Sequence, residues 1–326
     1  MLAIFWGVAG SIRSQRLGSI VRPSARRALG AGALRHNAAM SLPVAAPAAG
    51  RPIALALALS LGAAVSLGIT RFAYGLLLPV MREDLAWSYT LAGAMNTANA
   101  LGYLLGALAT PALMRRWGAA RVLLAGALAA SLFMAASGFF TDATMLLLQR
   151  LLAGVASALV FVSGGLLAAQ LGARSPQRAG LLLGLYYGGT GWGIAASALG
   201  VPLLLNAAPG AAHGWSWAWW GLALLCLAAC AVLAWPASLL QKTELRAQSS
   251  RGHEADLAQK LPWKAMAPAL AGYTLFGVGY IGYMTFVIAL LREQGVGAGA
   301  ITLFYTLLGL AVVASARIWA GLLQRA

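Results

Sequence analysis

The chain has 326 residues, of which 61% are hydrophobic and only 9% are charged, against roughly 25% charged in an average soluble domain. This composition excludes a water-soluble globular domain, because the chain has too little charge to cover a water-facing surface. The net charge of +16 does not indicate nucleic-acid binding, because the basic residues are spread over short loops instead of one face.

Residues 1–50 differ from the rest, because they hold several arginines and no acidic residue. A secretory signal does not fit, since the short apolar stretch 1–12 precedes the arginines instead of following them. Three interpretations stay open: a start assigned too early, with Met40 as the alternative, a disordered basic cytoplasmic extension, and a transit peptide.

From Arg51 onward the sequence consists of long, continuously apolar stretches, each of a length that can cross a bilayer. Continuous apolar character predicts helices, whereas the strands of a membrane barrel would alternate. We therefore predict an all-α polytopic membrane protein. The expected spans are residues 52–81, 89–114, 119–140, 143–171, 179–205, 215–233, 265–291 and 298–323.

The loop charges agree with eight spans. The loops after the second, fourth and sixth spans are basic, and those after the first, third, fifth and seventh are acidic or neutral. Basic loops stay on the cytoplasmic side. We therefore expect a multi-pass protein of the inner (cytoplasmic) membrane with both termini cytoplasmic. Its partners would be the lipid bilayer and a small-molecule solute, with no nucleic acid, and a monomer is the default oligomeric state.

The spacing of the spans divides the chain. Six closely spaced spans form an expected N-terminal half at 51–235, a polar central loop covers 236–264, and two further spans occupy 265–326. Two six-helix halves are a known transporter plan. Eight of twelve expected helices would then be present. On this interpretation the chain is truncated at its C-terminus, inactive on its own and prone to degradation.

Two arginines are predicted inside the spans. Arg71 lies well within the first and Arg150 early in the fourth, where burial of an arginine costs on the order of 2.5–3.5 kcal/mol. Such a residue is usually kept for a partner, a cavity or a solute, although snorkelling to an interface is the alternative. Tyr74 lies three residues from Arg71 and hence on the same helix face.

Other polar and small residues cluster in the second, fifth and seventh spans. Amides and a phenol form one stripe on the second span, which either lines a cavity or joins helices. The glycine-dense fifth span indicates tight packing or a bending point. The proposed cavity residues of these spans are Asn96, Asn99, Tyr103, Tyr186, Thr190 and Tyr280, and the proposed packing or gating glycines are Gly154, Gly184, Gly188, Gly189 and Gly193.

Catalytic and cofactor patterns are not found in the sequence. There is no phosphate-binding loop, and Ser163 has no histidine in a span to activate it. Cys226 and Cys230 are interpreted as small hydrophobic residues and not as metal ligands. We expect no enzyme activity, no cofactor and no metal site.

A family resemblance rests on three segments. The run from Arg150 through Gly154 to Ala158 resembles the fourth-helix motif of the major facilitator superfamily, with Ala153 where that motif usually has Gln. Residues 68–81 resemble the first helix of its YbfB/YjiJ branch. The loop after the second span is similar to the superfamily's cytoplasmic signature in weaker form, through Arg115, Arg116, Gly118 and Arg121.

The resemblance implies a secondary transporter that works by alternating access, and it assigns Arg150 to cavity polarity and proton coupling. Two arginines without a carboxylate deep in a span favour a small organic solute, possibly an anionic one, coupled to an ion or proton gradient. The alternative is a non-transporting polytopic membrane protein, such as an assembly factor or receptor, which would have a closed and apolar bundle centre.

Overall fold

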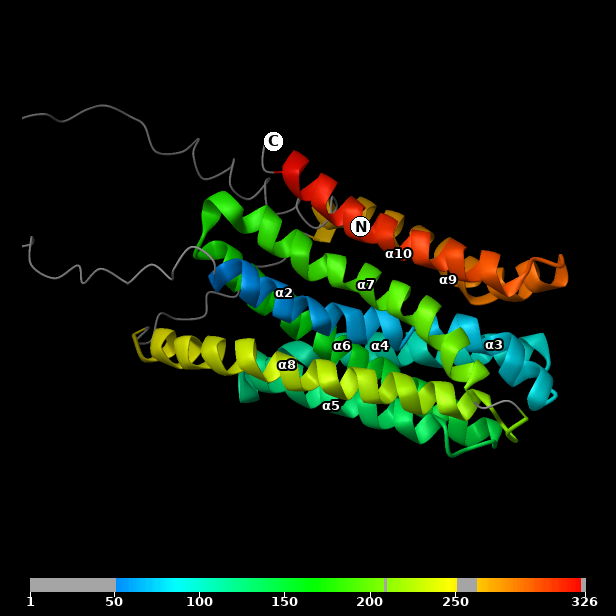
Figure 1. Cartoon of the computed structure of the whole chain (residues 1–326). Coiled ribbons are helices and arrows are strands. Elements are labelled where there is room, and N and C mark those ends of the chain that lie inside the picture. The colour runs from blue at the N-terminus through cyan, green and yellow to red at the C-terminus, as the bar shows by residue number, and fades with distance from the viewer. Residues whose placement is uncertain (1–50, 208–209, 251–262, 324–326) are drawn as a thin grey trace, which may run out of the picture.

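In the computed structural model, residues 51–207, 210–250 and 263–323 are described, and across these ranges the chain forms helices and no strand. The helices lie lengthwise beside one another in a single bundle (Figure 1). Their bounds are α2 Arg51–Ala63, η1 Ala64–Ile69, α3 Phe72–Asp84, α4 Tyr89–Trp117, α5 Ala119–Ser137, α6 Ala143–Ala173, η2 Pro176–Arg178, α7 Ala179–Asn206, α8 Trp215–Ser250, α9 Trp263–Glu293 and α10 Ala298–Leu323.

The all-α, polytopic fold predicted from the sequence is confirmed. Seven helical segments of the described chain are long and apolar enough to cross a membrane. The remaining expected span, α4, has 29 residues and is long enough, but Asn96, Asn99 and its glycines and threonines lower its hydropathy. Large apolar side chains such as Leu108, Phe139 and Leu275 point outward, as they do on a lipid-facing surface.

Two predicted spans differ from the helices observed. The first is not one regular helix: α2 and α3 are joined by η1, a π-helical turn, although together they form one 34-residue span. The sixth was expected to end near residue 233, but α8 continues to Ser250, since Pro236 leaves the helix unbroken. The first part of the expected central loop is therefore helical.

Short-range chemistry explains where several helices begin and end. Ser88 and Asp142 cap α4 and α6, because their side chains accept hydrogen bonds from the backbone of Leu91 at 3.1 Å and Met145 at 2.9 Å. Between α4 and α5 the turn is a single residue, Gly118, with φ +81° and ψ 153°. Only glycine adopts this conformation without strain, which is why the chain can reverse there so sharply.

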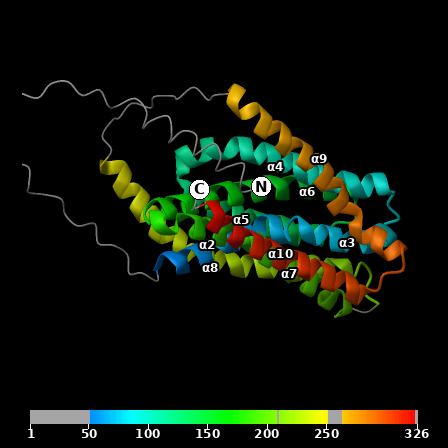
Figure 2. The same cartoon turned by 90° about the horizontal axis from the view of Figure 1, so that it is seen from above.

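The bundle is organised around the first span. Span α2–η1–α3 packs against α6 and α7, α5 fills the space between α6 and α8, and α4 packs on the outer side of α6. Helix α10 packs along the opposite side of α7. Figure 2 shows α9 inclined to the other helices. Its main contacts with the preceding helices are with α3.

The two ends of the bundle differ in charge. One end, which we call the basic end, carries Arg115, Arg116, Arg121 and Arg174 and the turns at Gly118 and at η2. The opposite, acidic end carries the turns that follow α3, α5, α7 and α9. The carboxylates at this end are Glu83, Asp84, Asp142 and Glu293.

Candidate functional site

The π-helical turn η1 shapes the centre of the bundle. Thr70, at its end, donates its backbone N–H to the carbonyl of Val65 at 3.1 Å, a bond one residue longer than an α-helix makes. The Thr70 hydroxyl donates to the same carbonyl at 2.6 Å. A π-turn disturbs the helical ladder and so leaves a carbonyl for an outside donor. Here that carbonyl is Thr70 O.

Arg150 of α6 fills this vacancy in the ladder. Its side chain is only 3% exposed, and its Nη1 donates to Thr70 O at 3.0 Å. The guanidinium carbon lies 4.7 Å from the centre of the Tyr74 ring and 5.8 Å from that of Trp219. Two aromatic faces and a backbone carbonyl thus stabilise the charge without a carboxylate. Nε and Nη2 of Arg150 make no hydrogen bond within the described chain.

Arg71 is the next residue after Thr70, but its environment is different. Its side chain is half-buried and its guanidinium carbon lies 6.0 Å from the ring centre of Tyr280 on α9. In the described part of the chain no carboxylate forms an ion pair with it. Of the two arginines predicted in the spans, Arg150 is enclosed by protein and Arg71 is accessible.

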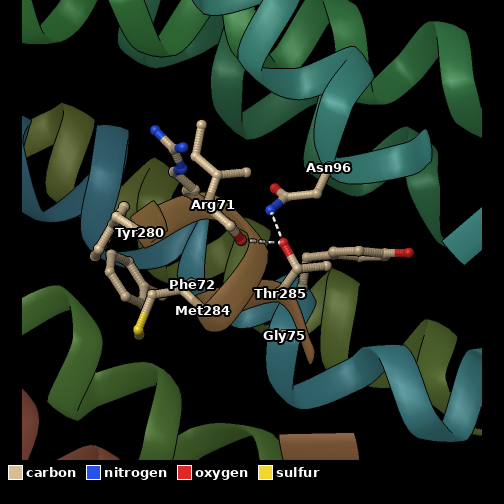
Figure 3. A pocket seen from close by; sticks show the side chains of 9 residues that line it. Arg71, Phe72, Gly75, Asn96, Tyr280, Met284 and Thr285 are labelled. Atoms are coloured by element: carbon tan, nitrogen blue, oxygen red, sulfur yellow. Dashed lines mark hydrogen bonds between the residues drawn. The ribbon is translucent and has the colours of Figure 1, made fainter. Parts of the chain in front are cut away.

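A small polar pocket lies beside Arg71, between α3, α4 and α9 (Figure 3). Its volume is about 10 Å³, about enough for one water molecule. The lining residues are Arg71, Phe72, Tyr74, Gly75, Asn96, Tyr280, Ile281, Met284 and Thr285. The predicted residues Arg71, Tyr74, Asn96 and Tyr280 therefore come together around one space.

Hydrogen bonds across the pocket join the two parts of the bundle. Nδ2 of Asn96 on α4 donates to the hydroxyl of Thr285 on α9, and the two side chains point toward one another in Figure 3. The Thr285 hydroxyl in turn donates to Ile281 O at 2.7 Å. Oδ1 of Asn96 is buried and has no partner in the described chain. Tyr74 donates its hydroxyl to Ala92 O at 2.7 Å, which ties α3 to α4.

The polar stripe of α4 serves two purposes. Asn96 faces the pocket, but Asn99 donates to Arg150 O at 3.0 Å and so joins α4 to α6. A Cβ on Gly154 of α6 would come within 2.1 Å of Asn99 O, so Gly154 permits this close approach. Tyr103 is half-buried and lies outside the pocket lining, within electrostatic range of Arg71.

The remaining predicted cavity residues lie elsewhere. Tyr186 is buried between α6 and α7 and donates its hydroxyl to Phe161 O at 2.8 Å. Thr190 lies on α7, and its carbonyl faces Gly68 of η1 so closely that a Cβ there would come within 2.6 Å. Neither residue lines the pocket.

The glycines of α7 form two packing faces. A Cβ on Gly189 or Gly193 would come within 1.9 Å of Ser60 O and 2.4 Å of Ala64 O, so these glycines let α2 approach. On the opposite face, Gly184 lies against Ala316 O of α10, where a Cβ would come within 2.8 Å. Gly188 on that face has ordinary clearance. The structure thus shows close packing at three of the four predicted α7 glycines.

The loop motif lies at the basic end. Arg115 and Arg116 are exposed, and the guanidinium carbon of Arg116 lies 6.0 Å from the Trp117 ring centre. With the Gln241 amide turned so that its oxygen faces Arg121, that oxygen accepts from Nε at 3.0 Å and Nη2 at 3.2 Å. Arg121 thereby connects the α4–α5 turn to α8.

Sequence reasoning missed Thr285 and Trp219, which contact two of the predicted residues. Thr285 follows Tyr280 by five residues in an apolar helix, and a lone threonine there carries a weak signal. Trp219 belongs to a tryptophan-rich segment at the start of α8, which gives no indication that one ring faces Arg150. Both contacts join helices that are far apart in the sequence.

A bundle of apolar helices around a small internal site with an unpaired cation is the architecture of a polytopic solute-handling membrane protein. A family model described as "Uncharacterised MFS-type transporter YbfB" matches residues 63–326. The chain therefore belongs to this family of the major facilitator superfamily, as its sequence resemblance indicated. It is a membrane transporter, and its class agrees with a non-enzymatic role. No curated protein matches the chain.

Proposed function

We propose that the chain transports a small organic anion by alternating access, and that Arg71 is the residue that binds the negative charge. The observation that carries this proposal is that Arg71 is half-buried beside the internal pocket with no carboxylate partner in the described chain. A cation left unpaired at membrane depth is costly, and a solute carboxylate would offset that cost through two parallel hydrogen bonds.

The rest of the pocket supports a polar solute. Oδ1 of Asn96 and two nitrogens of Arg150 are buried without partners in the described chain, so acceptor and donor positions are both available there. The pocket has room for only about one water-sized group, so a solute has to enter by moving α9 away from α3 and α4. Alternating access, driven by an ion or proton gradient, supplies such a movement.

Uptake and binding together test the charge assignment. The full chain is reconstituted in liposomes and assayed with radiolabelled small carboxylates and their neutral amides, and thermal unfolding is followed with the same compounds. We expect carboxylates alone to be taken up and to raise the unfolding temperature. Arg71→Gln should abolish both effects, and Arg71→Lys should retain part of them. Unchanged effects of every carboxylate in Arg71→Gln would refute the proposal.

We further propose that the basic end is cytoplasmic in the inner membrane. Its support is the concentration of arginines around the turns at Gly118 and η2, which follows the positive-inside rule. Single cysteines at exposed Arg116 and Phe139 mark the two ends. A membrane-impermeant maleimide should label Phe139→Cys but not Arg116→Cys in cells with a permeabilised outer membrane, and the reverse would invert the orientation.

A further inference from the structure

Three aromatic rings stack along one side of α9. The rings of Tyr273 and Phe276 have centroids 6.4 Å apart with planes at 28°, and those of Phe276 and Tyr280 have centroids 5.3 Å apart with planes at 17°. We call these three residues the ring ladder. Tyr273 is 43% exposed and Phe276 52% exposed, so much of the ladder's surface is uncovered by other described residues.

The ladder ends at the charged pocket. Its last ring, Tyr280, lines the pocket and lies 6.0 Å from the guanidinium carbon of Arg71. Beyond it, the Phe72 ring meets Tyr280 edge-on with centroids 6.3 Å apart. Tyr273, at the far end, is also within electrostatic range of Arg71. A continuous aromatic surface therefore leads to an accessible positive charge.

The size of the pocket sets what can bind there. A volume of about 10 Å³ admits a group no larger than a carboxylate oxygen, so the body of any solute held by Arg71 must lie outside it. The surface next to the pocket is the ring ladder. Around the neighbouring glycines Gly277 and Gly279, the space where a side chain would begin is open. A planar ring can stack there in the offset geometry that aromatic pairs favour.

We infer that the solute is an aromatic carboxylate, whose carboxylate binds Arg71 while its ring stacks on the ring ladder of α9. This inference rests on the proposed function, because it assumes that Arg71 binds the solute's charge. It adds the aromatic ring as the second determinant of specificity. Monocarboxylates are favoured over dicarboxylates, because Arg150, the other cation near the pocket, is enclosed by Tyr74 and Trp219.

Three probes of similar size separate the two determinants. Benzoate has the ring and the charge, cyclohexanecarboxylate has the charge and a non-aromatic ring, and benzamide has the aromatic ring without the charge. Calorimetric titration of the full chain in lipid nanodiscs gives a Kd for each. We expect benzoate to bind about three- to tenfold more tightly than cyclohexanecarboxylate. Benzamide should show no measurable binding.

Variants assign the preference to the ladder. Phe276→Leu and Tyr280→Leu should bring the benzoate-to-cyclohexanecarboxylate ratio close to one, whereas Tyr280→Phe, which keeps the ring, should preserve it. Tyr283→Leu is the matched control, because Tyr283 is an exposed aromatic residue of the same helix outside the ladder and the pocket. Arg71→Gln should abolish binding of both carboxylates.

The outcomes distinguish the inference from the proposed function. Equal affinities for benzoate and cyclohexanecarboxylate, both lost in Arg71→Gln, would overturn the aromatic preference and leave the anion proposal standing. Benzamide that binds as well as benzoate would overturn both, because Arg71 would then select no charge. No binding of any probe would overturn the aromatic inference, and the wider carboxylate panel described above would decide the anion proposal.

Discussion

The guanidinium of Arg150 donates to the backbone carbonyl of Thr70 at 3.0 Å, across 80 residues of sequence. This bond fixes the peptide that joins Thr70 to Arg71, and hence the position from which the Arg71 side chain enters the pocket. The resemblance assigned Arg150 to cavity polarity and proton coupling. The geometry adds a positioning role, because Arg150 is enclosed while Arg71 is accessible.

Removal of the Arg150 side chain should destabilise the bundle. Arg150→Ala leaves Thr70 O without its donor in an apolar interior and opens a space between Tyr74 and Trp219, at a cost of about 1.5–3 kcal/mol. Arg150→Lys should cost less, because an ammonium can reach the carbonyl but cannot cover both rings. Thermal unfolding in detergent measures both. Arg115→Ala, an exposed arginine, is the control, and an equal loss in that variant would contradict the prediction.

The bond between Asn96 and Thr285 should couple α4 to α9. Asn96→Ala and Thr285→Val are combined in a double-mutant cycle, with denaturant unfolding of each variant as the measurement. Membrane-embedded hydrogen bonds of this kind contribute on the order of 0.6–1.7 kcal/mol, so we expect a coupling free energy in that range. Strict additivity of the two single changes would show that the bond does not contribute to stability.

Addition of a methyl group to an α7 glycine should separate the helices it joins. Gly189→Ala would place a Cβ within 1.9 Å of Ser60 O, a backbone atom that cannot rotate away, so α2 must shift. Such overpacking typically costs about 1–3 kcal/mol. Gly200→Ala on the same helix meets nothing within 4 Å and is the matched control. Thermal unfolding should show a large loss for Gly189→Ala and little or none for Gly200→Ala.

At the acidic end, a carboxylate joins α3 to α8. Oδ2 of Asp84 lies 2.6 Å from Nδ1 of His213 and accepts from Nε1 of the buried Trp215 at 2.5 Å. Because Asp84 and His213 are 33% and 43% exposed, His213→Ala should cost under about 1 kcal/mol, and less at high salt. Asp84→Ala should cost more, since Trp215 also loses its acceptor. Unfolding at two salt concentrations compares the variants, and a larger effect of His213→Ala would contradict this order.

Sequence periodicity and charge were sufficient for the helices, because each span satisfies its own backbone and its ends are marked by local signals such as Ser88, Asp142 and Gly118. Four of the predicted cavity residues also line the pocket, since a polar side chain in an apolar span must face protein. Tyr186 and Thr190 do not, because which face of a helix meets a cavity depends on the neighbouring helices. The contacts Arg150–Trp219 and Asn96–Thr285 join distant segments and carry no local signal.

The π-helical turn also sets the phase of everything that follows it in the first span. A π-turn holds one residue more than the α-helix would, and each residue of an α-helix turns the chain by about 100°. Deletion of one residue between Ala64 and Ile69 would therefore yield a longer regular helix whose second half is rotated by about that angle. Arg71 and Tyr74 would leave the pocket although neither had been changed, so the site depends on the residue count of this turn as much as on its side chains.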